Sequence, residues 1–119
     1  MVFKDDMVRL QHMLEYAQKA VQFTRGRSRA DFDTDEMLAL ATIHLIETIG
    51  EAAKAISETI RERYAEIPWD LIIGTRNRLA HGYIDVDLDI IWAIVTTDLP
   101  PLIAQLEHIV KQEGHDVDA

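Results

Sequence analysis

The residues of this chain best suited to chemistry lie together in one stretch of eight, RNRLAHGY, at positions 76–83. The stretch contains Arg76, Asn77, His81 and Tyr83. A histidine titrates near neutral pH and can serve as a general base. An arginine is always charged, and its planar fork of N–H groups matches the oxygens of a phosphate. The residue types therefore predict chemistry at a phosphate group.

The spacing of these residues limits how they can meet. Asn77 and His81 are four residues apart, so on a helix they lie on the same face. Arg76 and His81 are five apart, which separates them by roughly 140° around a regular helix. They can converge on one phosphate only if the helix loosens near Gly82, or if residues of two chains meet.

A plainer interpretation of the same residues is structural. Cations at the C-terminal end of a helix mildly stabilise it through the helix dipole, and this is the commoner reason for an arginine and a histidine there. Tyr83 could simply pack on the end of the helix. Because short motifs are weak evidence alone, the surrounding sequence has to decide between the two interpretations.

The stretch also fits a longer pattern, namely Arg, four residues, His, one residue and Tyr, with Asn directly after the Arg. This pattern resembles the signature of HepT-like toxins in the HEPN superfamily of ribonucleases. A second segment, ETIGEAAK at 47–54, resembles the usual second-helix segment of that family. The resemblance spans nearly the whole chain, and it implies a small all-α bundle in which the motif closes the third helix.

The resemblance implies a function as well. It predicts a metal-independent endoribonuclease that is the toxin of a type VII-like toxin–antitoxin pair and works as a homodimer, with its active sites in the cleft between subunits. In that role His81 would take the proton of a ribose 2′-hydroxyl and Arg76 would hold the phosphate. Asn77 would orient His81 or bind the phosphate. Cleavage of RNA would leave a 2′,3′-cyclic phosphate and a 5′-hydroxyl.

The same resemblance implies a regulatory role for Tyr83. In the family, the corresponding tyrosine receives AMP from ATP, transferred by a nucleotidyltransferase antitoxin of the MntA type. AMP on Tyr83 would place charge and bulk where RNA must lie, and would block the site. The expected partners are therefore RNA, a second copy of the chain and an MntA-like antitoxin, and the only expected cofactor-like group is covalent AMP.

The elements that must position these residues are helical in pattern. Apolar residues recur at helical spacing and no strand alternation is present, while Gly, Pro and Asp residues mark the expected helix ends. The predicted fold class is therefore all-α, an up-and-down bundle of four to five helices in one domain covering 1–119. The expected helices run from Asp5 or Asp6 to Gly26, from Asp33 to Tyr64, from Pro68 to Gly82, and from Asp85 or Asp87 to Gly114, followed by a frayed tail at 114–119.

Two features of these helices carry further expectations. Pro100 and Pro101 should kink or split the last helix, with Thr97 or Asp98 capping its second part. The second helix is apolar on two sides and therefore needs two neighbours. Its small residues Gly50, Ala52 and Ala53 would let one of them come close. We expect this helix to serve both the core and a homodimer contact.

The charge balance bears on the expected RNA substrate. The chain has 12 Lys plus Arg against 21 Asp plus Glu, a formal net charge of -9. This balance argues against nonspecific nucleic-acid binding, which depends on basic side chains that neutralise phosphates. Four arginines that occur in groups are nevertheless candidate RNA contacts, namely Arg25, Arg27, Arg29 and Arg78. For each of them, a solvated charge on the surface is about as good an explanation.

The absence of cysteine excludes a disulfide framework and a thiolate zinc site, and it fits a reducing compartment. No apolar run is long enough to cross a bilayer. The first residues, MVFKDDMVRL, lack the features of a secretory signal. We therefore expect a cytoplasmic protein without membrane association.

Two alternatives remain open. His44 and Glu47, with Glu51 beyond, have spacings that occur in metal sites of helical bundles, but no second set of ligands is present, so we expect no metal. Glu51 could instead support the active site from the neighbouring helix. From a different functional class, the chain could be a noncatalytic helical module that docks a nucleotidyltransferase, with the motif as its docking patch.

Overall fold

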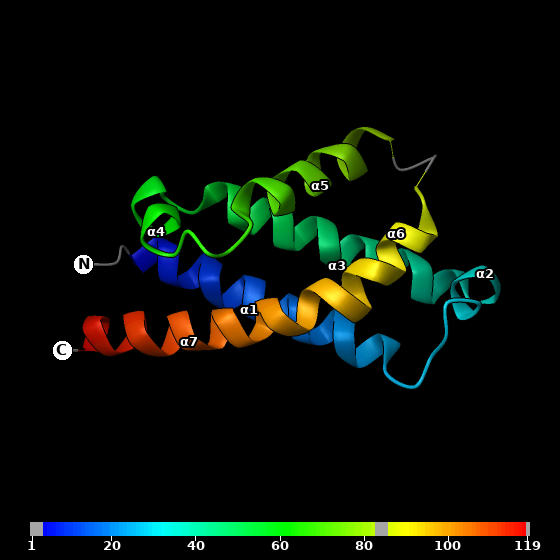
Figure 1. Ribbon diagram of the computed structural model, residues 1–119, viewed down its shortest axis with the longest axis horizontal. Helices are drawn as coiled ribbons and strands as arrows, with labels where there is room; N and C mark the ends of the chain where they lie inside the picture. Colours follow the sequence, from blue (N-terminus) through cyan, green and yellow to red (C-terminus); the bar gives the residue numbers. More distant parts are fainter. Residues whose placement is uncertain (1–3, 83–85, 119) are drawn as a thin grey trace.

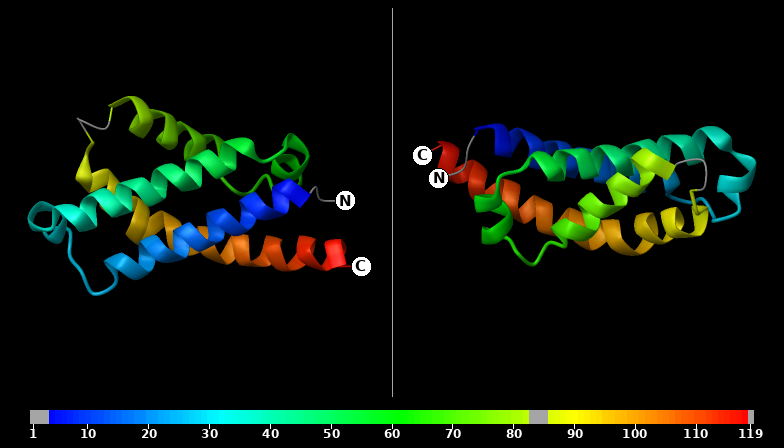
Figure 2. Two further views of the ribbon diagram at one scale, coloured as in Figure 1. Left: turned by 180° about the vertical axis from the view of Figure 1, so that it is seen from behind. Right: turned by 90° about the horizontal axis from the view of Figure 1, so that it is seen from above.

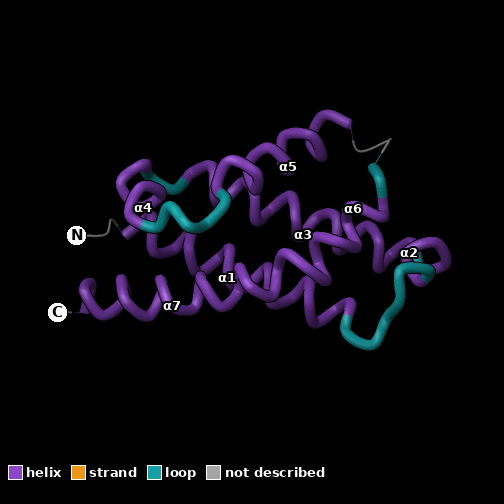
Figure 3. Tube along the Cα trace, viewed as in Figure 1, coloured by secondary structure: helices purple, strands orange, loops and turns teal. Residues whose placement is uncertain are grey.

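The computed structural model describes residues 4–82 and 86–118, and the secondary structure of these two ranges is entirely helical, without a strand (Figure 1, Figure 3). Loops and turns join the helices. The predicted all-α class is confirmed. The elements in chain order are α1 (Lys4–Thr24), α2 (Asp31–Thr34), α3 (Glu36–Ala55), α4 (Glu58–Arg63), α5 (Trp69–Gly82), α6 (Leu88–Ala93), the π-helix η2 (Ile94–Asp98) and α7 (Leu99–Asp118).

Four long helical segments run up and down along the molecule. α3 packs between α1 and α5, while α6, η2 and α7 form one continuous segment that returns along α1 (Figure 1, Figure 2). The short helices α2 and α4 sit at opposite ends of the bundle, before and after α3 (Figure 1). The resulting shape is elongated, 49 × 29 × 21 Å.

The core is a single apolar cluster shared by all the long helices. Full burial of each large apolar side chain stabilises the fold by about 1.5–3 kcal/mol before the loss of conformational entropy is counted. The most completely buried large side chains of this cluster are Leu10, Met13, Ile56, Ile60, Ile67, Ile91, Val95, Leu106 and Ile109.

The first helix has the predicted limits to within two residues. It ends at Thr24, and Gly26 follows with a φ of 75°. A left-handed backbone there is easy for glycine and unfavourable for residues with a side chain, so Gly26 is the local signal that stops the helix.

The second predicted helix, continuous from Asp33 to Tyr64, is wrong. The chain breaks first at Asp35, whose side chain accepts a hydrogen bond from the Leu38 N–H and caps α3, so the cap is Asp35 and not Asp33. It breaks again after Ala55, because Ile56 takes an extended conformation with a ψ of 139°. Ser57 then caps the separate helix α4.

A contact with α1 explains the second break. The buried carboxylate of Asp6 accepts hydrogen bonds from the Ser57 N–H at 2.9 Å and from the Ser57 hydroxyl at 2.7 Å. A backbone N–H inside a continuous helix would already be bonded to a carbonyl four residues back. The bond to Asp6 therefore replaces a helical bond and holds the start of α4 against α1.

The last predicted helix is confirmed at its start and corrected in its middle. Asp87 caps α6 by accepting a hydrogen bond from the Asp89 N–H. Pro100 and Pro101 do not split the segment, and neither Thr97 nor Asp98 caps a new helix, because the wider π-helical turns of η2 lead directly into α7, with the Leu99 N–H bonded to the Ile94 carbonyl five residues back. The prolines then fall in the first turn of α7, where missing N–H groups are tolerated.

The C-terminal end of α7 is anchored to α4. Glu113 is 1% exposed, and it accepts hydrogen bonds from the Tyr64 hydroxyl and from Arg63 Nη1, the latter at 2.9 Å. Beyond Gly114, where the pattern predicted a frayed tail, α7 remains helical to Asp118. None of the helices in the described ranges has the length and apolar character of a membrane span.

Candidate active site

The third predicted helix, from Pro68 to Gly82, is confirmed as α5 and carries the motif. Pro68 precedes its first residue, and the Pro68 carbonyl accepts the Ile72 N–H at 3.1 Å. Trp69 anchors this end, because its ring is buried and its indole N–H donates to the Tyr64 carbonyl at 3.0 Å. The start of α5 is therefore fixed by the core, and residues 76–82 of the motif occupy its last two turns.

Arg76 lies where α5 crosses α3, and its guanidinium is held by two neighbours. Nη2 donates to Glu51 Oε1 at 3.0 Å, and Nη1 donates to the Oδ1 of the adjacent Asn77 at 3.1 Å. The Arg76 side chain is 21% exposed, whereas that of Glu51 is 57% exposed. A cation fixed in this way, at the edge of solvent, is well placed to bind an anion.

Gly50 explains how Arg76 can sit so close to α3. A Cβ atom added at Gly50 would lie 2.2 Å from the Cβ of Arg76 and 3.1 Å from the Ile72 carbonyl oxygen, so only glycine fits this crossing. Ala53, one turn further on, is fully buried. The expectation that small residues of this helix let a neighbour come close is therefore confirmed at Gly50, where the neighbour is the chain's own α5, while Ala53 lies in the core.

The rest of the described motif presents polar side chains outward. Asn77 and Arg78 are exposed, whereas Leu79 is buried and holds the helix on the core. Arg78 forms no hydrogen bond or ion pair with the residues that the structure describes. α5 thus turns one face inward and leaves the polar face of the motif accessible.

The two remaining motif positions are only partly covered. His81 belongs to the last turn of α5, but its side chain lies outside the described residues, as does the whole of Tyr83. The backbone of α5 is helical through Gly82, so the loosening that would bring Arg76 and His81 together within one helix is not observed. The separation of roughly 140° around the helix therefore stands.

The arginines of the 25–29 loop lie in a different part of the molecule. Arg27 pairs with Asp35 at 2.7 Å, at the start of α3, and Glu51 is 16 residues further along that helix. At 1.5 Å per residue, the two positions are about 24 Å apart. Within one chain, the loop and the Arg76 site are therefore separate.

Two of the loop arginines are engaged by carboxylates. The hydrogen bond to Asp35 raises the pKa of Arg27. Arg29 donates to Asp89 at 2.6 Å and to Asp33 at 3.2 Å, which ties the loop to α6. The side chain of Arg25 is exposed and has no such partner among the described residues.

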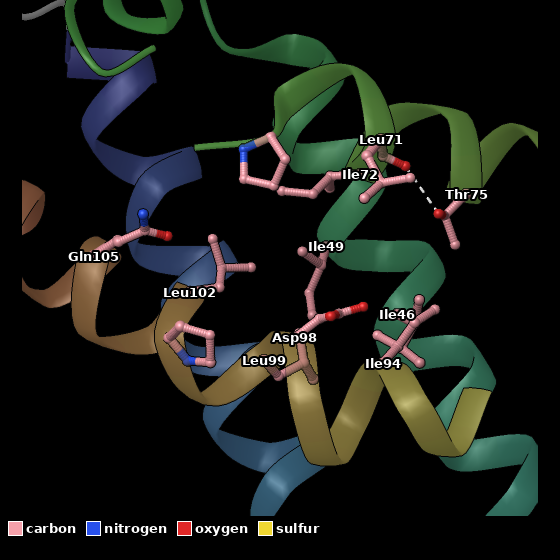
Figure 4. Close-up of a pocket in the computed structure, with 12 residues that line it drawn as sticks. Ile46, Ile49, Leu71, Ile72, Thr75, Ile94, Asp98, Leu99, Leu102 and Gln105 are labelled. Atoms are coloured by element: carbon pink, nitrogen blue, oxygen red, sulfur yellow. Dashed lines mark hydrogen bonds between the residues drawn. The ribbon is translucent and has the colours of Figure 1, made fainter. Parts of the chain in front are cut away.

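A well-formed apolar groove lies apart from Arg76 and Asn77. It lies between α5 and the η2–α7 segment, over Ile46 and Ile49 of α3, and has a volume of about 300 Å³ (Figure 4). Leu71, Ile72 and Thr75 line its α5 side. Among the described residues that line it, only Asp98 is charged. The motif residues Arg76 and Asn77 are absent from this lining.

A smaller recess of about 150 Å³ lies between α5 and α6 and does include a motif residue. Arg78 lines it together with Thr75, Val86 and Asp87.

The described residues contain no group of three or more His, Asp or Glu side chains placed to hold a metal ion, so His44, Glu47 and Glu51 do not form such a group.

Sequence comparisons add independent information. The sequence model of the family described as "Ribonuclease HepT-like" matches residues 13–109, which include the motif. A "Putative RNase" of Caldanaerobacter subterraneus subsp. tengcongensis is 34% identical over 104 residues, 87% of this chain and 93% of the relative. A "Putative RNase" of Methanocaldococcus jannaschii is 34% identical over 98 residues, 82% of this chain and 90% of the relative. A "Probable ribonuclease HepT" of Thermococcus cleftensis is 33% identical over 102 residues, 86% and 93% of the two chains. No solved structure matches the chain significantly.

Proposed function

The chain belongs to the HepT-like ribonuclease family, and from this premise we propose that it is an endoribonuclease whose site is built from Arg76, Asn77 and His81. The observation that carries the proposal is the fixed and partly exposed guanidinium of Arg76, held at the crossing of α3 and α5 beside the exposed Asn77. A cation held in one orientation can stabilise the negative charge that develops on a phosphate during cleavage.

The proposed reaction uses the ribose of the substrate as the nucleophile. His81 accepts the proton of a 2′-hydroxyl, and the 2′-oxygen attacks the adjacent phosphorus. The bond from phosphorus to the 5′-oxygen breaks, and that oxygen takes a proton from the imidazolium or through water. The products are a 2′,3′-cyclic phosphate and a 5′-hydroxyl. Arg76 binds the phosphate throughout, so the reaction as proposed needs no metal ion.

The site as proposed combines two copies of the chain. Arg76 and His81 are about 140° apart on a helix that is regular through Gly82. A second subunit in a symmetric dimer would bring its own His81 to Arg76, and the reverse pair would form a second equivalent site. This arrangement satisfies the spacing without distortion of α5.

The proposed regulation acts next to this site. Tyr83 lies two residues after His81 in the chain. An MntA-like nucleotidyltransferase antitoxin would transfer AMP from ATP to the Tyr83 hydroxyl, with release of pyrophosphate. The new phosphate and base would occupy the path of the RNA and repel its backbone. The chain would then be the toxin of the pair, active when Tyr83 is unmodified.

Outside Arg76, Asn77 and His81, the arginines proposed to contact RNA are those without an ion pair among the described residues. Arg78, the motif residue that lines the recess between α5 and α6, is proposed to contact the RNA backbone. Arg25 is a second candidate. Arg27 and Arg29 already bind carboxylates of their own chain, so any contribution of theirs would compete with those ion pairs.

Cleavage of a fluorescently labelled single-stranded RNA by purified protein in excess EDTA tests the proposal. The unmodified chain should cut the RNA, and His81→Ala and Arg76→Ala should each lower the rate by about 10²–10⁴-fold, the usual contribution of a general base or of a charge-stabilising group. His108→Ala, an exposed histidine of α7, is the control and should cut normally. Full activity of His81→Ala with an unchanged circular dichroism spectrum would contradict the mechanism.

A second measurement addresses the regulation. The intact mass of the protein should increase by one adenylyl group after incubation with ATP and an MntA-like nucleotidyltransferase, and RNA cleavage should fall in parallel. Tyr83→Phe should keep its original mass. If AMP is attached to another residue, or if the modified protein still cuts RNA, the proposed role of Tyr83 is wrong.

A further inference from the structure

We infer that Glu51 is a positioning residue, which sets the orientation of Arg76 for phosphate binding from the neighbouring helix. The inference rests on the proposed ribonuclease function. It goes further by giving roles to two residues outside the 76–83 stretch, Glu51 and Gly50.

The geometry shows that Arg76 is oriented from α3 as well as from its own helix. Gly50 allows the backbone of α5 to approach until the Cβ of Arg76 lies against α3. Glu51, the next residue along α3, receives a hydrogen bond from Nη2 at 3.0 Å. The glycine thus sets the distance between the helices, and the carboxylate sets the direction of the guanidinium.

The donors of Arg76 can be counted. A guanidinium has five N–H groups. One on Nη2 is bonded to Glu51 and one on Nη1 to Asn77, while the Nε–H is buried without a hydrogen-bond partner among the described residues. One N–H remains on each Nη. Two N–H groups on adjacent nitrogens match two oxygens of one phosphate.

The charge of Glu51 has the opposite effect on RNA from its hydrogen bond. A carboxylate close to the phosphate site repels the substrate, so a Glu51 without a positioning role would only weaken RNA binding. Its removal would then tighten binding and leave turnover unchanged or faster. If Glu51 positions Arg76, its removal lowers turnover despite the more favourable charge. The two cases therefore predict changes in turnover that differ in direction.

Three substitutions separate charge from hydrogen bonding. Glu51→Ala removes both, Glu51→Gln keeps an acceptor oxygen without the charge, and Glu51→Asp keeps the charge on a shorter side chain. We expect kcat for cleavage of the labelled RNA to fall by about 10–100-fold in Glu51→Ala, as expected for a misplaced catalytic group. Glu51→Gln should restore most of the lost kcat, and Glu51→Asp only part of it. Equal or higher kcat in Glu51→Ala would overturn the positioning role.

An activity-independent measurement completes the test. The ¹H–¹⁵N signal of the Arg76 Nε–H can be identified from its loss in Arg76→Lys. It should shift or broaden in Glu51→Ala and stay near its wild-type position in Glu51→Gln. Glu47→Ala, one turn earlier on α3, is the matched control and should leave the signal in place. An unperturbed signal in Glu51→Ala would refute positioning, whereas an inactive wild-type protein with the expected shift would refute only the ribonuclease proposal.

Discussion

Gly50 and Arg76 touch across the crossing of α3 and α5, so closely that a single added methyl group on Gly50 would lie 2.2 Å from the Cβ of Arg76. Real Cβ atoms essentially never approach other atoms so closely. One contact therefore determines both how closely α3 and α5 pack and where the candidate phosphate-binding arginine lies. A change that pushes the two helices apart must also move Arg76.

This contact predicts opposite effects of alanine at two helical glycines. Gly74 of α5 has nothing within 4 Å of its added Cβ, so Gly74→Ala should stabilise the protein by about 0.5–1 kcal/mol, the usual gain in a helix interior. Gly50→Ala gains the same helix propensity, but its added methyl group also overlaps Arg76 where the two helices cross. Such overpacking typically costs about 1–3 kcal/mol or more. Urea unfolding should therefore give a higher midpoint for Gly74→Ala and a lower one for Gly50→Ala. Similar midpoints for the two variants would show that α3 and α5 do not approach this closely.

The anchor between α4 and α7 gives a second prediction. The Tyr64 hydroxyl donates to Glu113, whose carboxylate is almost fully buried. Tyr64→Phe keeps the ring but removes the donor, so the carboxylate loses one hydrogen bond, at a cost of about 1–3 kcal/mol. Tyr16→Phe on α1 is the control, because Tyr16 is partly exposed and its hydroxyl has no hydrogen bond with the described residues. Equal unfolding free energies for the two variants would show that the hydrogen bond between Tyr64 and Glu113 does not stabilise the fold.

The same carboxylate predicts how stability depends on pH. Burial raises the pKa of Glu113, but the hydrogen bonds from Tyr64 and Arg63 outweigh it, so the pKa in the folded protein is below the usual range. A lowered folded pKa means that the ionised group stabilises the fold above its unfolded pKa of about 4.3, and that this contribution is lost as the pH falls through the folded value. Glu113→Gln cannot titrate. The advantage in unfolding free energy that wild type has over Glu113→Gln should therefore shrink as the pH falls below about 4.3. An advantage that grows on acidification would contradict a lowered folded pKa.

The helix ends that sequence reasoning placed well are those with a local cause. Gly26 stops α1 through its own backbone preference, and Pro68 and Asp87 mark helix starts through properties of one residue. The break between α3 and α4 has no local cause of that strength. It depends on Asp6, which is 51 residues from Ser57 in the chain. A pattern of apolar spacing carries no information about such a partner.

The candidate site was likewise predictable where the signal is local and not where it depends on a distant contact. The motif residues were predicted from their types and from the family pattern, and Glu51 was one possible support; the structure brings Glu51 into hydrogen-bonding contact with Arg76. Gly50 was noticed as a small residue, but the sequence does not tell whether a small residue faces its own chain or another. The pairing of Arg27 and Arg29 with carboxylates was also missed, although Asp31 and Asp33 follow them at the four-residue spacing of helical ion pairs.

The hydrogen bonds of Ser57 predict a further stability effect. Its hydroxyl caps α4 through the Ile60 N–H and donates to the buried Asp6 at 2.7 Å. Ser57→Ala removes both interactions and should destabilise the protein by about 1–2 kcal/mol, the usual range for a lost cap. Ser28→Ala, in the exposed loop after α1, should change stability much less. Hydrogen exchange should show faster exchange at the start of α4 in Ser57→Ala, and unchanged exchange there would contradict the capping role.

The proposal that one site uses Arg76 of one subunit and His81 of another predicts recovery of activity from two inactive variants. In a mixed dimer of Arg76→Ala and His81→Ala, one of the two sites lacks both groups, while the other retains the intact His81 of the first chain and the intact Arg76 of the second. Random mixing makes half of the dimers mixed, so about a quarter of the wild-type sites should be restored. If each site lay within one chain, every subunit of the mixture would lack one group and no activity would return. RNA cleavage measured before and after the two purified variants are unfolded and refolded together decides between the cases, with each variant refolded alone as the control.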